Sequence, residues 1–426
     1  MITRLEATRY RCLERLDADL GEFALVVGAN GAGKTTFLDL PVLLGDLLTQ
    51  KDAAAAFSSR LRGLPPRCGA LSELVFCGRG DDFILAVEAA LPDTVVRELL
   101  PSRSGPVQNQ DEWWPRFIRY ELRLQVFNQR SLYVDGEYLF LFSRASVPDR
   151  DQFRLLGEHA RKKDWRFVID RAPGQDAQFR SELGKTAKPR SVRFEPEKLA
   201  FARMSLEGRN EFPAAAWLYS LLSENSLGYR PNSSVLQTAS PPGQADVPVA
   251  DAANLPWLAM GLRNRNPKRF QAWVDHVRTA LPQIVEIEVH ERQDDHHAYF
   301  RLVYQGGHSV TSSGLSEGTL RVLALTLLPY VEKRQAVLVV EEPEIGIHPH
   351  GIESVIQSLS SVYNSQVLVT THSPVVLAQC RLDQILCARL EESGAASVVP
   401  GRKHPRLTAW KGRIDLGALF AAGVLG

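Results

Sequence analysis

A glycine-rich segment near the N-terminus has the residue types that bind phosphate. Gly28 and Gly33 are separated by four residues, and Lys34 and Thr35 follow at once. Glycines let backbone N–H groups turn toward an anion, and the start of a helix adds partial positive charge. In this pattern the lysine contacts the β- and γ-phosphates as a catalytic cation, and the threonine hydroxyl can ligate Mg²⁺. The alternative is a chance match. The residues that we predict to bind ATP are Gly28, Asn30, Gly31, Gly33, Lys34, Thr35 and Thr36.

Two adjacent acids, Glu341 and Glu342, follow the four aliphatic residues 337–340. Carboxylates at the end of a buried strand are costly unless a metal or a proton transfer uses them. We predict that Glu341 holds Mg²⁺ through water, and that Glu342 polarises the attacking water as the general base. A solvated strand end is the alternative interpretation.

A third strand end carries a histidine, in Thr370-Thr371-His372-Ser373. Functional groups gather at the carboxyl ends of parallel strands, beside the phosphate loop. This position favours a catalytic role for His372, which would sense or hold the γ-phosphate. A histidine that follows a strand by coincidence is the alternative.

These residues require a parallel sheet to bring them together. The apolar segment Phe23–Val27 predicts a buried strand before the glycines, and a helix opens at Phe37, with Pro41 tolerable only near its first turns. From Ser313 onward helices and strands alternate, which predicts a parallel sheet covered by helices. The expected elements are helices at 322–331 and 352–363 and strands at 336–340 and 366–370.

Other segments alternate as antiparallel strands do. They lie at 83–91, at 120–142 with Asp135-Gly136 as a tight turn, and at 284–289 and 299–304 around Asp294-Asp295. The segments beginning at Leu255 and Phe270 are compatible with helices, and the proline-rich segment 229–256 reads as a connector.

The helix before the acidic strand opens with Leu315-Ser316-Glu317-Gly318, which resembles the Leu-Ser-x-Gly signature of ATP-binding-cassette (ABC) ATPases. Ser316 and Gly318 would direct a hydroxyl and an amide toward an anion. Together with 28–35, 341–349 and 371–374, this segment resembles the RecF/SMC branch of these ATPases. The resemblance extends to bacterial AAA-labelled predicted ATPases, among them those of overcoming-lysogenization-defect nucleases and anti-phage defence systems.

The resemblance implies an α/β fold of the ABC-ATPase P-loop type. This fold has a mixed, largely parallel sheet, an antiparallel β subdomain and a helical insertion. The ATPase domain would then occupy residues 1–150 and 284–426, with the insertion at 151–283. It also implies two ATP molecules held between the subunits of a homodimer or higher homo-oligomer, and places Arg11, in Arg9-Tyr-Arg-Cys12, near the nucleotide.

The sequence departs from the family pattern at two positions. Glu341 stands where most ABC ATPases have aspartate, and His348 stands where the cross-dimer loop usually has aspartate. Gln125 is the candidate for the glutamine that couples the nucleotide to the inserted lobe.

Charge excludes a protein that coats nucleic acid indiscriminately, because 50 Lys and Arg against 49 Asp and Glu give a net charge of +1. Residues 151–210 hold 14 basic and 9 acidic residues, a local excess of +5. This segment, with a second group between Arg263 and Arg269, would suit DNA or tRNA. A solvated helix face explains it equally well. The basic residues are Arg161, Lys162, Lys163, Lys185, Lys188, Arg190, Arg193, Arg263, Arg265, Lys268 and Arg269.

The remaining signals concern location and rival functions. Scattered cysteines, a charged start and the lack of a long apolar run favour a cytoplasmic protein away from membranes. The leading hypothesis is an ATPase that switches contacts with nucleic acid or with a separately encoded effector, such as a nuclease or toprim-like protein. Its expected role is in phage defence or DNA maintenance. Its rivals are a non-hydrolysing scaffold locked by ATP and a nuclease with an unrecognised site. A transporter ATPase is the weakest alternative, and a metal site among His290–His297 is disfavoured by spacing.

Overall fold

A computed structural model describes residues 1–61, 63–100, 111–148, 162–183, 188–207, 210–332, 336–407 and 415–423. The chain divides into two compact units, which we describe separately. Unit 1 comprises Met1–Leu20, Leu40–Glu224 and Leu390–Val398, and unit 2 comprises Gly21–Asp39, Asn225–Arg389 and Val399–Gly426. The predicted ranges 1–150, 151–283 and 284–426 follow sequence motifs rather than contacts, and they stay a prediction. Within the predicted insertion, the described residues between 162 and 283 form strands as well as helices.

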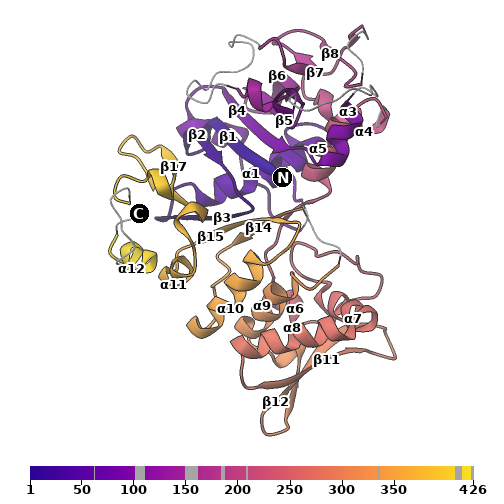
Figure 1. The fold of residues 1–426 in the computed structure, drawn as a ribbon, viewed down its shortest axis with the longest axis vertical. Coiled ribbons are helices and arrows are strands. Elements are labelled where there is room, and N and C mark those ends of the chain that lie inside the picture. The colour runs from indigo at the N-terminus through magenta and orange to yellow at the C-terminus, as the bar shows by residue number, and fades with distance from the viewer. Residues whose placement is uncertain are drawn as a thin grey trace. The chain divides into compact units, whose positions relative to one another are not determined.

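Unit 1 is built on an eight-stranded antiparallel sheet in the order β2-β1-β4-β5-β6-β7-β8-β9 (Figure 1). Its central strands are buried on both faces, which explains their nearly continuous apolar character. Its strands are β1 (Ile2–Tyr10), β2 (Leu13–Asp19), β4 (Asp82–Ala90), β5 (Phe117–Phe127), β6 (Ser131–Phe142), β7 (Arg166–Arg171), β8 (Ala177–Phe179) and β9 (Arg190–Val192). Its helices are α2 (Ala55–Ser58), α3 (Asp93–Leu99), α4 (Ala200–Glu207) and α5 (Pro213–Ser223).

The turn between β5 and β6 differs from the prediction. Asp135-Gly136 lies inside β6, where the pairing with β5 shifts register between Arg123 and Leu124. The chain instead reverses at 128–130, where Asn128 and Gln129 have φ of 48° and 57°. The expected turn was therefore wrong. The Asp-Gly pair instead lies at an irregularity within a long strand, and glycine often marks such irregularities as well as turns.

A six-stranded sheet has the order β10-β14-β15-β3-β16-β17; its first five strands belong to unit 2 except for Leu390 at the end of β16, and β17 is divided between the two units after Val398. The pairs β10–β14, β14–β15, β15–β3 and β3–β16 are parallel, as the alternation of helices and strands predicted. The strands are β3 (Phe23–Gly28), β10 (Ser226–Gly228), β14 (Val337–Glu341), β15 (Gln366–Thr371), β16 (Ile385–Leu390) and β17 (Ala396–Pro400).

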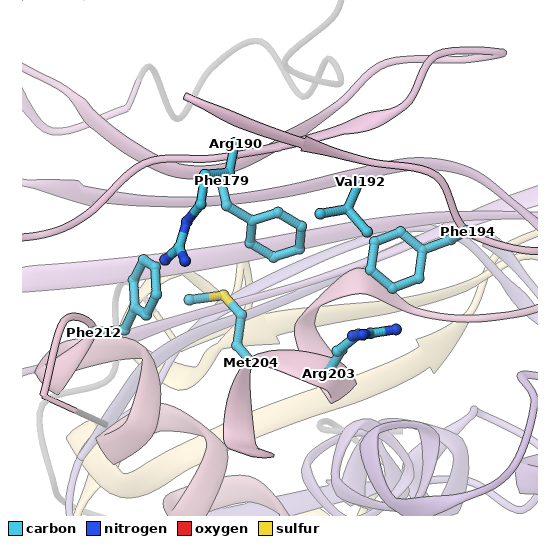
Figure 2. A pocket seen from close by; sticks show the side chains of 7 residues that line it. All are labelled: Phe179, Arg190, Val192, Phe194, Arg203, Met204 and Phe212. Carbon is cyan, nitrogen blue, oxygen red and sulfur yellow. The ribbon is translucent and has the colours of Figure 1, made fainter. Parts of the chain in front are cut away.

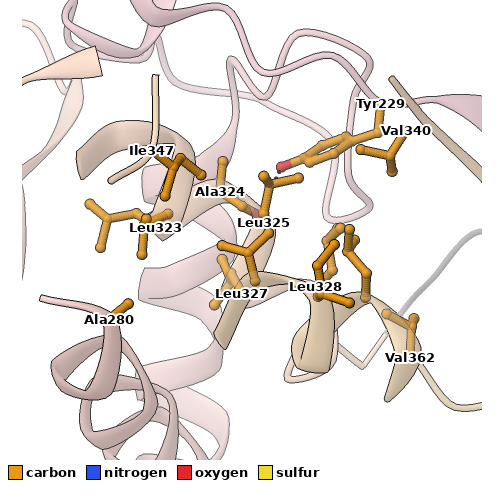
Figure 3. Packing of buried hydrophobic residues seen from close by; sticks show 14 of the residues in the cluster. Tyr229, Ala280, Leu323, Ala324, Leu325, Leu327, Leu328, Val340, Ile347 and Val362 are labelled. Carbon is orange, nitrogen blue, oxygen red and sulfur yellow. Dashed lines mark hydrogen bonds between the residues drawn. The ribbon is translucent and has the colours of Figure 1, made fainter. Parts of the chain in front are cut away.

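Apolar helices pack beside this sheet. The buried face of α9 contributes Leu323, Ala324 and Leu327, and the hydroxyl of Tyr229 donates a hydrogen bond to the Ala324 carbonyl at 3.2 Å (Figure 3). Burial therefore does not leave that hydroxyl without a partner. The helices of unit 2 are α6 (Ser233–Leu236), α7 (Leu255–Arg265), α8 (Pro267–Ala280), α9 (Glu317–Leu327), α10 (Pro349–Ser360), α11 (Pro374–Ala378) and α12 (Leu416–Ala421).

Two helices begin earlier than expected. Helix α1 (Lys34–Thr49) starts directly after the glycines, so Pro41 lies in its interior rather than near its first turn. Proline there removes one backbone donor but does not end the helix, since buried residues on both sides hold α1 in place. Helix α9 starts at Glu317 because Ser316 caps it; this agrees with the predicted opening at Leu315–Gly318 and is five residues before the expected range 322–331.

A small three-stranded antiparallel sheet completes unit 2. Strands β11 (Ile284–Glu291) and β12 (Ala298–Tyr304) form the predicted hairpin, and β13 (Ser309–Thr311) pairs with β12. The histidines of this hairpin contact neighbouring acids: His290 contacts Glu288 at 2.6 Å and His296 contacts Glu291 at 2.7 Å. Among the described residues, no helix is both long and apolar enough to cross a membrane.

Candidate functional site

The phosphate loop of unit 2 connects the buried strand β3 to α1. Gly28, Gly31 and Gly33 all have positive φ, at 151°, 79° and 81°. At Gly28 a side chain is impossible, because a Cβ would lie 1.9 Å from the carbonyl oxygen of Ala388 on the neighbouring strand β16. The loop therefore depends on glycine both for its backbone angles and for close strand packing.

The lysine of this loop is buried against its own backbone. The Lys34 amine donates hydrogen bonds to the carbonyls of Gly28 at 3.0 Å and Ala29 at 2.8 Å. Desolvation lowers the pKa of Lys34, an effect that the negative charge of Glu342 opposes. Asn30 and Thr35 are exposed. The amine is thus held inside the curve of the loop, where a phosphate would meet it.

Strand register brings the predicted site residues to one edge of the sheet. In the parallel ladder Glu341 is level with Thr370, and Thr371 is level with Val27, one residue before the phosphate loop. Strands β14, β15 and β3 are direct neighbours in the sheet. The acids, the histidine segment and the loop therefore leave adjacent strands in the same direction.

Glu341, the predicted metal ligand, is paired with an arginine. Arg230 Nη2 donates to Glu341 Oε1 at 2.5 Å. Desolvation raises the pKa of Glu341; Arg230 opposes this shift, while the charges of Asp39 and Glu342 add to it. Three carboxylates therefore act on one another at this strand end, with Arg230 bound to one of them.

Glu342, the predicted base, has a strained backbone. Its φ of 42° is in the left-handed region, which is unfavourable for a residue with a side chain. Three contacts hold this conformation: the Glu342 amide donates to the Thr370 carbonyl at 3.0 Å and to its hydroxyl at 3.3 Å, and Arg321 donates to the Glu342 carbonyl at 3.2 Å. The Glu342 carboxylate lies 3.4 Å from His372 Nε2. The strain thus directs the side chain of Glu342 toward that of His372.

Glu344 is a site residue that the sequence prediction missed. Its Oε1 accepts hydrogen bonds from the Thr371 hydroxyl at 2.5 Å and from the His372 amide at 3.0 Å. Its Oε2 is buried and has no hydrogen-bond partner. Glu344 therefore ties the loop after β14 to the end of β15 and fixes the backbone of His372. The repeated acids in Glu341-Glu342-Pro343-Glu344 were the available signal.

The signature-like residues pack on the loop that follows the acids. Ser316 caps α9 by accepting from the Thr319 amide at 3.2 Å. A Cβ at Gly318 would lie 2.2 Å from the Gly346 carbonyl oxygen, so α9 and this loop are in contact. Arg321, one turn further along, reaches the Glu342 carbonyl. Helix α9 is thus joined to the backbone of the predicted base.

Several predicted residues are not gathered at this edge by any described contact. Arg11 and Gln125 belong to unit 1, where Arg11 donates to the Arg67 carbonyl and Gln125 to Asp81. His348 is the N-cap of α10, and its ring accepts from the His350 amide at 3.3 Å.

Part of the predicted basic surface is engaged in internal contacts. Arg190 pairs with Glu211, Arg265 with Glu332, and Arg263 donates to a carbonyl of β11. Arg161 and Lys185 lie outside the described residues. A nucleic-acid surface at these residues stays a prediction.

Unit 1 has an aromatic pocket of about 90 Å³ at the end of its sheet (Figure 2). Strand residues Phe179 and Val192 face Met204 and Arg203 of α4 across it. The remaining lining residues are Arg190, Phe194 and Phe212. Phe194 also contacts the guanidinium of Arg171, 5.8 Å from its ring centre. The described contacts are those of a packed aromatic cluster.

The residues at the sheet edge of unit 2 fit a magnesium nucleotide. A Cβ at Gly31 would meet no atom within 4 Å, so the loop has open space on its outer side. Thr35 is exposed at the start of α1, and Glu341 carries a carboxylate at the end of β14. Hydroxyl and carboxylate oxygens are the ligands that Mg²⁺ prefers.

Comparison with known proteins supports the same fold. The SMC head bound to the C-terminal winged-helix domain of ScpA has 13% sequence identity, with 93% of this chain and 97% of that chain covered and a TM-score of 0.50. An SMC head with an extended coiled coil, bound to the C-terminal domain of ScpA derived from Pyrococcus furiosus, gives 13% identity, coverage of 93% and 95%, and a TM-score of 0.48. The first likeness confirms the predicted mixed α/β fold of the ABC-ATPase type.

Two sequence comparisons bear on the family of this chain. A segment of 48 residues is 48% identical to the OLD nuclease of Thermus scotoductus; the match spans 11% of this chain and 9% of that protein. The predicted resemblance to RecF/SMC-like ATPases and to overcoming-lysogenization-defect proteins is confirmed. A family match covers residues 118–378, more than half of the chain. The chain therefore belongs to the family described as AAA domain, putative AbiEii toxin, Type IV TA system.

Proposed function

We propose that this ATPase-family chain binds Mg²⁺-ATP and hydrolyses it, with Glu342 as the general base. The observation that carries the proposal is the contact of 3.4 Å between Glu342 and His372, on strand ends next to the phosphate loop. Lys34 and the loop amides would bind the phosphates, and Thr35 and Glu341 would hold Mg²⁺. The bound metal neutralises charge on the phosphates. His372, whose backbone Glu344 fixes, would contact the γ-phosphate.

We further propose that ATP assembles the chain into a homodimer. Ser316 and Gly318 of one subunit would close over the nucleotide of the other, since the N-terminus of α9 offers amides to an anion. The contact of Gly318 with Gly346 and of Arg321 with Glu342 gives this helix a direct connection to the base. ATP-dependent assembly would then switch contacts with nucleic acid or with a separate effector protein, such as a nuclease in phage defence.

The Glu342→Gln substitution tests the role of the base. It should leave ATP binding at the parental level and lower the steady-state hydrolysis rate by about 100-fold or more, because a positioned base contributes at least that much. Glu353→Gln, a change at an exposed acid of α10, is the matched control and should hydrolyse ATP at the parental rate. Hydrolysis by Glu342→Gln at the parental rate would exclude Glu342 as the base.

Two further measurements separate this function from its rivals. Lys34→Ala should abolish ATP binding, which tests the phosphate loop. The Glu342→Gln protein should double its molar mass in light scattering when Mg²⁺-ATP is added, which tests the homodimer. Tight ATP binding by the parental protein without turnover, even with DNA present, would favour an ATP-locked scaffold. Metal-dependent DNA cleavage that survives Lys34→Ala would favour a nuclease.

A further inference from the structure

Arg230 is placed beside Glu341 by strand pairing. Strand β10 runs parallel to β14 with Gly228 level with Val339, and the Tyr229 amide donates to the Val339 carbonyl at 2.7 Å. Two residues beyond Gly228 in this register, Arg230 is level with Glu341. The Arg230 amide is fixed by the Ala250 carbonyl at 2.7 Å. The backbone on both sides of this pair is thus held by hydrogen bonds.

The side chain of Arg230 can leave this position more easily than that of Glu341. Arg230 is 40% exposed, whereas Glu341 is 20% exposed. The guanidinium contacts Oε1 of the carboxylate at 2.5 Å. Since arginine has a long flexible stem and remains charged at any working pH, its head can move into solvent without losing its proton. The carboxylate, at the end of a buried strand, stays in place.

The local charges favour a cation at Glu341. The negative charges of Asp39, in α1, and of Glu342 both act unfavourably on the Glu341 carboxylate, so three negative charges contribute to the field at Glu341. Arg230 offsets one of them, and Mg²⁺ would offset two. A guanidinium and a hydrated divalent cation cannot both bind the same carboxylate at full strength. Both are positively charged and would repel each other when they contact one carboxylate.

We propose that Arg230 is a tethered counter-ion that competes with Mg²⁺ for Glu341, and so sets the Mg²⁺ concentration at which the site takes up Mg²⁺-ATP. The inference rests on the proposed function, in which Glu341 serves the metal. Arg230 acts through Glu341 and is a positioning residue. When Mg²⁺ arrives with the nucleotide, the guanidinium leaves Oε1 and its charge moves toward solvent.

Arg230→Gln tests the competition in the full chain. A fluorescent N-methylanthraniloyl derivative of ATP is bound at a fixed concentration, and Mg²⁺ is titrated while the fluorescence is recorded. The Mg²⁺ concentration for half-maximal binding should fall about three- to tenfold, because one competing unit charge is removed. Arg230→Lys retains a charge and should lie between the parental protein and Arg230→Gln.

Arg265→Gln is the matched control, because Arg265 forms a similarly exposed ion pair with Glu332 in the same unit. Its Mg²⁺ dependence should equal that of the parental protein. An unchanged midpoint in Arg230→Gln, or a midpoint shifted to higher Mg²⁺, would overturn the competition. Thermal unfolding of each variant identifies any loss of folding; if Arg230→Gln does not fold, Arg230→Ala, which also removes the charge, is judged by the same criterion.

The same titration distinguishes failure of the inference from failure of the proposed function. If the parental protein and Lys34→Ala bind the nucleotide equally weakly at every Mg²⁺ concentration, the proposed ATP site is wrong and the role of Arg230 falls with it. If the parental protein binds the nucleotide and Arg230→Gln has the parental midpoint, the ATP site stands and only the competition is wrong.

Discussion

Both units place arginines and acids inside or at the end of a sheet, but they pair them differently. In unit 1, Arg119 uses all three of its nitrogen positions: it contacts Glu6 at 2.5 Å, Glu88 at 2.7 Å and Glu121 at 2.5 Å. These side chains are at most 5% exposed. Arg4 contacts the other oxygen of Glu6 and two further acids on β2. In this network each nitrogen position of Arg119 contacts a buried carboxylate, and Glu6 is bound by both arginines.

The acids at the sheet edge of unit 2 are matched less completely. Glu344 Oε2 is buried without a hydrogen-bond partner, and so is the Nε of Arg321. Glu342 has a strained backbone and approaches His372 at 3.4 Å, longer than an ordinary hydrogen bond. The same residue types are therefore fully paired around Arg119 in unit 1 and incompletely paired at the sheet edge of unit 2.

The pKa values of two arginines are shifted in opposite directions, which reflects this difference. Burial alone would lower the pKa of Arg119, but the charges of Glu6, Glu121 and Glu88 outweigh it and raise that pKa well above its usual range. For Arg321, burial lowers the pKa, and the charges of Glu317, Glu344 and Glu342 do not make up for it. Completeness of pairing, rather than the number of charges, separates the two regions.

The largest effect is expected from breaking the matched network. Arg119→Met leaves three buried carboxylates without their common partner, so the free energy of unfolding of unit 1 should fall by about 3–5 kcal/mol. Urea unfolding followed by tryptophan fluorescence measures the change. Arg190→Met, which removes one partner of the exposed pair with Glu211, is the control and should lose less than about 1 kcal/mol. Equal losses in the two variants would contradict the comparison.

Glu182 is a buried acid of unit 1 that is paired with backbone amides, in contrast to the acids that Arg119 contacts. It accepts from Ala214 at 2.7 Å and Ala215 at 2.9 Å at the start of α5. Burial raises the pKa of Glu182 to about 7, although these two hydrogen bonds oppose the shift. A raised pKa in the folded state means that the folded protein binds this proton more tightly than the unfolded chain does.

The stability that Glu182 contributes should therefore be complete below about pH 4.5 and lost as the pH rises to about 7. We expect a loss on the order of 3 kcal/mol over this window, measured as the free energy of unfolding at each pH. Glu182→Gln cannot ionise, so this part of the pH dependence should disappear. A slope between pH 5 and 7 that is identical in both proteins would show that Glu182 does not cause it.

Local signals in the sequence were sufficient to place the glycine-rich loop, the acids and His372 at one edge of the sheet. A short apolar run precedes each group: the glycine-rich loop from Gly28, the acids after Val340 and the histidine after Thr371. Neighbouring parallel strands bring such ends to the same edge of a sheet. The fold class followed from the same alternation. The Asp135-Gly136 turn failed because a local turn signal competed with strand pairing, and the pairing of β5 with β6 was stronger.

The partners of the acids could not be predicted in this way. Arg230 is separated from Glu341 by 111 residues, and their contact depends on β10 pairing with β14. The sequence around Arg230 is rich in proline and polar residues, which indicates a connector and hides the short strand. Glu344 was visible as a third acid, but its bond to the His372 amide depends on how the loop after β14 turns.

The smallest effect is expected from neutralising an incompletely paired acid. Glu344→Gln keeps a carbonyl oxygen that can accept from the Thr371 hydroxyl and the His372 amide, and it replaces an oxygen that has no partner. The free energy of unfolding should change by no more than about 0.5 kcal/mol, because no matched charge is lost. Thr371→Val, which removes a hydroxyl donor to Glu344, should lose about 1 kcal/mol in the same urea experiment. A loss in Glu344→Gln as large as that in Arg119→Met would mean that the charge of Glu344 stabilises the fold as fully as the network of unit 1 does. The difference between the two regions would then lie in something other than the completeness of their pairing.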